Sequence, residues 1–138
     1  MRSNASTREF RLGNGRFKCS VAAPFIKLRE TAQRDTDTRN DLDRTTPFEF
    51  AGGNDTEFTV TRCGPHEACV TFSRSQNPPR IRITGYGIPE DLEIRTILNA
   101  AGECELVLAS DGTRIPVWRI LSKALDALFF DDKTDHPR

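Results

Sequence analysis

Long apolar runs are missing from this chain of 138 residues, in which hydrophobic residues make up 36% and the mean hydropathy is -0.54. A helix needs about 20 consecutive, mostly apolar residues to cross a bilayer. The first residues, MRSNASTREF, also lack the apolar core of a secretion signal. We therefore expect no membrane contact and a cytoplasmic location. So low a hydrophobic content also predicts that part of the chain is poorly ordered.

An excess of charge of either sign is missing too. Twenty basic and twenty acidic side chains cancel, and the isoelectric point is about 6.7. This balance argues against a protein whose whole surface binds nucleic acid or an anionic membrane, but it leaves room for a local basic patch. Four cysteines are too few for a disulfide-rich secreted scaffold, so a reducing compartment is the default expectation.

No catalytic set can be recognised. The chain has two histidines, of which His136 lies close to the last residue, and no nucleophile-elbow motif supports a Ser-His-Asp triad. The glycine pairs at 13–15 and 85–87 lack the longer pattern that cradles phosphates, and they indicate turns instead. We therefore predict a protein that is not an enzyme and that needs no cofactor.

The sequence contains turn signals between segments in which apolar and polar residues alternate. Hairpins are predicted for residues 8–21, 57–74 and 104–118, with turns at Asn14-Gly15, at 64–68 and at Asp111-Gly112. In the second hairpin, pairing Cys63 with Cys69 brings four apolar side chains to one face, namely Phe58, Val60, Val70 and Phe72. In the third, Leu108 is expected to face Ile115. Another strand is expected at 80–86.

Helical spacing replaces this alternation near the end of the chain. Residues 118–130 predict an amphipathic helix whose apolar stripe includes Leu121, Leu125 and Leu128. Residues 89–101 favour a second helix, since Pro89 resembles a helix start and Gly102 a helix stop, although the same segment also alternates as a strand. The fold class is therefore α+β: a mainly antiparallel sheet with the C-terminal helix packed on one face.

One domain is expected to span residues 8–130, between a flexible N-terminus at 1–7 and a flexible tail at 131–138. Residues 29–46 contain only two apolar side chains among many charges. They predict a polar, charged loop that is either solvated or ordered by a partner.

Cys63, His66 and Cys69 form the sharpest motif in the chain. Two thiolates and an imidazole at this spacing could bind zinc, with Cys19 or Cys104 as a fourth ligand, or could act as a cysteine nucleophile with its base. Structural zinc sites usually contain a second close pair of ligands, which this sequence does not offer. Two cross-strand cysteines beside a turn are the simpler interpretation.

Arginines mark a second candidate site. Arg80 and Arg82 share one face of a predicted strand, with Arg74 and Tyr86 close in sequence. Guanidinium groups beside an aromatic ring suit single-stranded nucleic acid. An ordinary solvated strand face explains the same pattern, and the neutral overall charge favours that explanation.

A third candidate surface surrounds the single tryptophan. If the helix covers Leu106 and Leu108, then Val107, Pro116 and Trp118 remain on the other side of the last hairpin. An apolar patch with a Trp is typical of a protein–protein interface. We therefore predict a small interaction or regulatory module that contacts a protein partner or forms a homodimer, with nucleic-acid binding and a zinc or cysteine site as alternatives.

Overall fold

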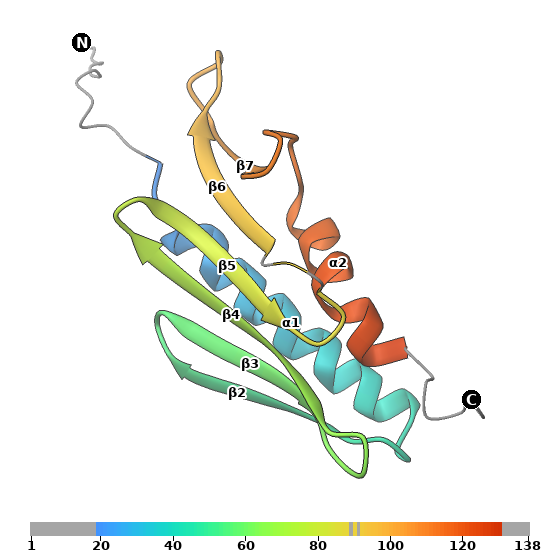
Figure 1. The fold of residues 1–138 in the computed structure, drawn as a ribbon. Helices are drawn as coiled ribbons and strands as arrows, with labels where there is room; N and C mark the ends of the chain where they lie inside the picture. Colours follow the sequence, from blue (N-terminus) through green and yellow to red (C-terminus); the bar gives the residue numbers. More distant parts are fainter. Residues whose placement is uncertain (1–18, 89, 91, 131–138) are drawn as a thin grey trace.

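The computed structural model describes residues 19–88, 90 and 92–130. Its elements follow the order α1 (Ala22–Leu42), β2 (Phe48–Asn54), β3 (Glu57–Arg62), β4 (Ala68–Gln76), β5 (Pro79–Gly85), β6 (Leu92–Leu98), β7 (Cys104–Leu108) and α2 (Val117–Phe130). The six strands form one sheet in sequence order, and every neighbouring pair is antiparallel. Both helices lie on the same face of the sheet (Figure 1). The predicted α+β class is thus confirmed.

The hairpin predicted at 57–74 is present, and its apolar face is confirmed. Phe58, Val60, Val70 and Phe72 are all buried beneath the helices. The predicted register is wrong by two residues, because Cys69 faces Thr61 rather than Cys63. A shift of two leaves every side chain on its original face, since side chains in a strand alternate with a period of two.

The segment at 104–118 forms a hairpin in part only. The chain turns at 109–112, where Gly112 has a φ of +76°, and the Leu108 N–H donates to the Thr113 carbonyl. The return segment makes a single bridge, between Arg114 and Val107, so the predicted pairing of Leu108 with Ile115 is wrong. Pro116 has no N–H to donate, and α2 begins directly after it. The pairing of the return segment with β7 therefore ends at Pro116.

The helix favoured at 89–101 is wrong, because these residues contain the strand β6. Its partners are β5 and β7, and Ile94 faces Ile81 and Leu108 across them. Residues 92–98 fit both a helical and an alternating pattern. They form a strand because β5 and β7 pair with them on either side. The hairpin predicted at 8–21 falls mainly outside the described residues, and 19–21 form no strand.

The polar loop predicted at 29–46 is also wrong, since most of it belongs to α1. One stripe of this helix faces the sheet and is buried, formed by Phe25, Leu28, Ala32 and Thr36. Thr36 keeps its place in the stripe because its hydroxyl donates to the Ala32 carbonyl at 2.7 Å. A narrow apolar stripe is enough here because tertiary packing, rather than local propensity, stabilises most helices in proteins. Neither helix in the described part of the chain is both long and apolar enough to span a bilayer.

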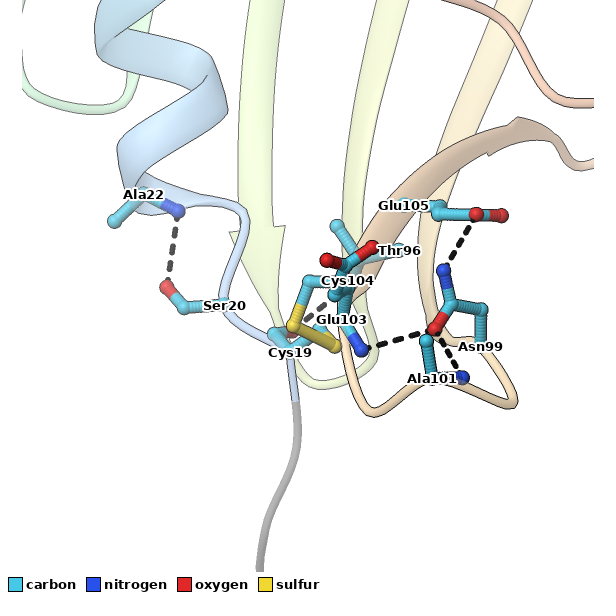
Figure 2. Close-up of a disulfide and its surroundings, with 9 residues drawn as sticks. All are labelled: Cys19, Ser20, Ala22, Thr96, Asn99, Ala101, Glu103, Cys104 and Glu105. Carbon is cyan, nitrogen blue, oxygen red and sulfur yellow. Dashed lines mark hydrogen bonds between the residues drawn. A yellow bond between two sulfur atoms is a disulfide. The ribbon is translucent and has the colours of Figure 1, made fainter.

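Helix α1 is attached to the sheet at both ends. At its start, Cys19 forms a disulfide with Cys104 of β7, and the Thr96 hydroxyl of β6 donates to the Cys19 carbonyl at 2.9 Å (Figure 2). At its end, the Asn40 side-chain amide exchanges two hydrogen bonds with the backbone of Phe48, the first residue of β2. The helix therefore runs from one edge of the sheet to the other.

The predicted C-terminal helix is confirmed as α2, which packs against the sheet. A buried arginine holds its last turn. Arg62 of β3 is 7% exposed, and its guanidinium donates to the carbonyls of Leu128 and His66, at 3.0 Å each. The same group lies 4.7 Å from the centre of the Tyr86 ring. A cation at the carboxyl end of a helix stabilises the free carbonyls there, so Arg62 fixes where α2 ends on the sheet.

Candidate functional site

A groove with a volume of about 390 Å³ runs between the outer sides of α1 and α2. The two helices run in the same direction (Figure 1). Helix α1 contributes Thr31, Asp35, Thr38, Arg39 and Leu42, and α2 contributes Trp118, Leu121, Ser122, Leu125, Asp126, Phe129 and Phe130. Each set follows the three- and four-residue spacing of one helical face, so the groove extends along both helices.

The groove is bordered by large apolar side chains that remain in water. Leu42 is 76% exposed, Trp118 66% and Phe130 60%. Leu121, Leu125 and Phe129 lie deeper and are buried against the core. Apolar side chains scattered singly over a surface are normal, whereas a group of them around one hollow marks a binding site.

Three charged side chains line the groove, namely Asp35, Arg39 and Asp126. Partial burial raises the pKa of Asp35, and the nearby Arg34 opposes that rise. Asp126 is exposed and accepts a hydrogen bond from Ser122 at 2.7 Å. The one cation in the lining, Arg39, lies 3.8 Å from Asp43 and 4.7 Å from the centre of the Phe130 ring. The groove therefore combines apolar walls with two carboxylates and one guanidinium group.

Of the three predicted interface residues, only Trp118 lines this groove. Val107 is 4% exposed, and it faces Arg95 and Arg114 on the side of the sheet away from the helices. Pro116 is exposed and lines a separate hollow with Glu105 and Arg114. The expected single patch of Val107, Pro116 and Trp118 is thus not assembled, because the chain turns from strand to helix between Pro116 and Trp118.

Asp35, Leu42 and Phe130 are among the groove residues that the sequence analysis did not single out as candidate site residues. Phe130 ends the predicted helix, but its exposure depends on where the sheet and α1 leave room. Asp35 and Leu42 belonged to the segment interpreted as a loop. A spacing of four and seven residues, from Thr31 to Asp35 and on to Leu42, was the available signal. It is weak because two of these three side chains are polar.

The cysteine motif is only loosely assembled. Cys63 is half-buried, whereas His66 and Cys69 are exposed. Cys19 and Cys104, considered as a fourth ligand, are joined to each other. Within residues 19–88, 90 and 92–130, no three His, Cys, Asp or Glu side chains lie close enough to hold a metal ion. We therefore assign no function to this loop.

Cys63 is expected to be a slow nucleophile. Partial burial raises the pKa of its thiol, and the negative charges of Glu49 and Glu67 raise it further. Because only the thiolate attacks, alkylation by iodoacetamide at neutral pH should be slower for Cys63, in a Cys69→Ser variant, than for the same variant unfolded in urea. The rate should rise with pH through a midpoint above that of an ordinary thiol. A folded protein that reacted as fast as the unfolded one would contradict this and restore the case for an activated cysteine.

The arginines predicted to bind nucleic acid do not all share a face. Arg80 and Arg82 lie on the side of the sheet away from the helices, where Arg80 faces Arg95 and Arg82 faces Glu93. Arg74 faces Ile81 on the helix side, and its guanidinium donates to the Asp55 carbonyl at 2.8 Å. Tyr86 packs against the core beneath Arg62. The predicted stacking platform beside Arg80 and Arg82 is therefore not formed by Tyr86.

Comparisons of the chain with protein-family models, with characterised proteins and with solved structures give no significant match. Function is therefore inferred from the geometry of the groove between α1 and α2.

Proposed function

We propose that this protein is a small, non-enzymatic interaction module that binds a protein partner in the groove between α1 and α2. One observation carries the proposal: three of the six large apolar side chains that are most exposed among the described residues border this groove, namely Leu42, Trp118 and Phe130. Burying such side chains against a partner contributes about 25 cal/mol for each Å² of apolar surface removed from water.

The occupant we infer is an apolar segment of another protein that carries a lysine or an arginine. The groove follows two parallel helices, which suits a helical segment with apolar anchors at three- and four-residue spacing. The negative charge of Asp35 favours a basic residue in the partner. Asp35 is a partly desolvated carboxylate, and a cation brought beside it would offset the cost of that desolvation.

Trp118 supplies both the anchor and the reporter for a test. Short random peptides displayed on phage would be selected against the wild-type protein, and the enriched peptides would then be measured against Trp118→Ala. Enriched peptides should combine spaced apolar residues with Lys or Arg. Because the chain contains one tryptophan, a selected peptide should shift the Trp118 emission to shorter wavelength as it removes the indole from water.

Single substitutions measure how much each side chain contributes to the affinity for a selected peptide. Trp118→Ala should weaken a selected peptide about 30-fold or more, as for a central aromatic anchor. Asp126→Asn should weaken it roughly two- to fivefold, as for an exposed ion pair. Ile26→Ala is the matched control, since Ile26 is an apolar residue of α1 that is 52% exposed and does not line the groove, and it should leave the affinity unchanged.

Two outcomes would overturn the proposal. Peptides that bind Trp118→Ala as tightly as the wild type would place the interaction elsewhere. Light scattering that showed a concentration-dependent dimer, abolished by Trp118→Ala, would make a second copy of this chain the occupant instead of a different protein.

A further inference from the structure

The polar side chains in the groove between α1 and α2 follow a fixed order along its length. The Arg39 guanidinium of α1 lies 4.7 Å from the centre of the Phe130 ring of α2, so these two residues mark one level of the groove. Asp35 and Asp126 each stand four residues earlier in their helices, which places both carboxylates about one turn, or 5.4 Å, before that level. Trp118 stands about two turns further back on α2. Along the groove, an indole is thus followed by carboxylates and then by a guanidinium group.

The Arg39 side chain sets a condition on anything that fills the groove. Its Nε atom is buried and has no hydrogen-bond partner within the described residues. Asp43 lies 3.8 Å from the Nη2 atom, which is beyond hydrogen-bond distance. An occupant that covers Arg39 removes more water from this cation, and burying a charged group without an acceptor is costly. We therefore expect the occupant to bring an acceptor to Arg39, and a carboxylate is the strongest one that a protein offers.

The ends of the two helices favour one direction for a helical occupant. Both helices run the same way, so that the carboxyl ends of α1 at Leu42 and of α2 at Phe130 lie at one end of the groove (Figure 1). Free carbonyls give a helix C-terminus partial negative charge, and free N–H groups give a helix N-terminus partial positive charge. An occupant helix is therefore stabilised when it begins beside these two ends. Acidic residues are favoured in the first turn of a helix, and Arg39 stands where that turn would lie.

On the basis of the function proposed above for the groove, we propose that its occupant is a helix antiparallel to α1 and α2. An acidic side chain of this helix lies against Arg39, and a basic side chain lies between Asp35 and Asp126. The basic residue follows the acidic one by three or four positions, because the groups that they meet are one turn apart. An apolar residue about two turns later packs on Trp118. An acidic residue four positions before a basic one is also the order that better stabilises an isolated helix.

Peptides that can form about four helical turns, with charged and apolar residues at random positions, are the probe. They would be selected on phage against the full chain, and their affinity would be measured by the emission of Trp118. Enriched peptides should carry Asp or Glu three or four residues before Lys or Arg. Exchanging these two residues within an enriched peptide should weaken it more than tenfold, because both charges then face a like charge.

A double-mutant cycle measures the contact with Arg39. Arg39→Gln should weaken an enriched peptide about tenfold, as for the loss of a charged hydrogen bond. Changing the acidic residue of the peptide to its amide should weaken binding to the wild type by a similar factor, and should have no further effect on Arg39→Gln. The altered peptide tests the contact even if Arg39→Gln does not fold. Arg119→Gln is the matched control, because Arg119 is an exposed arginine of α2 that does not line the groove, and it should bind like the wild type.

A nitroxide label on the first residue of the peptide measures the direction of binding. In NMR spectra of the complex, the label should broaden the amide signal of Phe130 more strongly than that of Trp118. Stronger broadening at Trp118 would show a helix that runs parallel to α1 and α2, and it would overturn the proposal.

Two further outcomes separate this inference from the function on which it rests. Peptides that need Trp118 but bind Arg39→Gln as tightly as the wild type would overturn the inference and leave the groove as the binding site. Enriched peptides that bind Trp118→Ala as tightly as the wild type would overturn both.

Discussion

Replacing Phe58 by alanine is expected to lower the free energy of unfolding by about 3–5 kcal/mol. The Phe58 ring stacks on Phe72 of β4, with the ring centres 4.4 Å apart, and contacts Phe25 of α1 at 5.3 Å and Phe50 of β2 at 5.5 Å. It is 1% exposed, so its removal leaves a cavity where α1 meets three strands. Because domains are stable by only about 5–15 kcal/mol, this one substitution removes a large share of the total.

Urea unfolding followed by circular dichroism would measure the effect. Phe130→Ala is the matched control, because Phe130 is 60% exposed and should cost less than about 1 kcal/mol. If the alanine variant does not fold, Phe58→Leu should give a measurable, smaller loss. Equal losses at Phe58 and Phe130 would show that the aromatic cluster is not the core of this protein.

Breaking the Cys19–Cys104 disulfide is expected to cost about 2–4 kcal/mol. The bond joins residues 85 positions apart, so it closes a long loop and restricts the unfolded chain strongly. It also attaches the start of α1 to β7, where the Thr96 hydroxyl adds one hydrogen bond to the Cys19 carbonyl. Its loss should therefore release the start of the helix as well as lower the overall stability.

Denaturation with and without dithiothreitol would test this. Cys19→Ser with Cys104→Ser should be as stable as the reduced wild type, and reductant should not change it further. The control is Cys63→Ser with Cys69→Ser, because both cysteines are free; that variant should lose stability in reductant as the wild type does. Four titratable thiols in protein purified without reductant would contradict the bond.

The bond also bears on where the protein resides. Disulfides persist in oxidising compartments and are rare in the cytosol. The cytoplasmic location expected from the sequence therefore stays a prediction, and the disulfide argues against it.

The buried faces of two elements could be predicted from the periodicity of their own apolar residues. Side chains alternate in the segment around 57–74, so the burial of Phe58, Val60, Val70 and Phe72 could be predicted even though the register was off by two. The helix at 117–130 could be predicted for the same kind of reason, since its apolar stripe is broad and contiguous. Both patterns are strong because each element buries one complete face.

Other features could not be predicted, since they depend on residues far apart in the chain. The first helix has only a narrow stripe of apolar residues. Phe25 and Leu28 of this stripe precede the charged residues 29–46, which the sequence analysis interpreted as a loop. The strand at 92–98 shows two competing periods, which its neighbours resolve. The pairing of Cys19 with Cys104 follows from the way α1 begins beside β7, which no local spacing indicates.

By itself, the sequence determined which side chains go inward in each strongly patterned segment, because burial of apolar surface acts on each segment's own periodicity. Only the tertiary structure decided what remains on the outside: that Trp118 borders a groove while Val107 is buried, and that Arg80 and Arg82 meet Glu93 and Arg95 rather than Tyr86. Those surfaces arise where two or more elements meet, and the way the elements meet is set by packing of the whole chain.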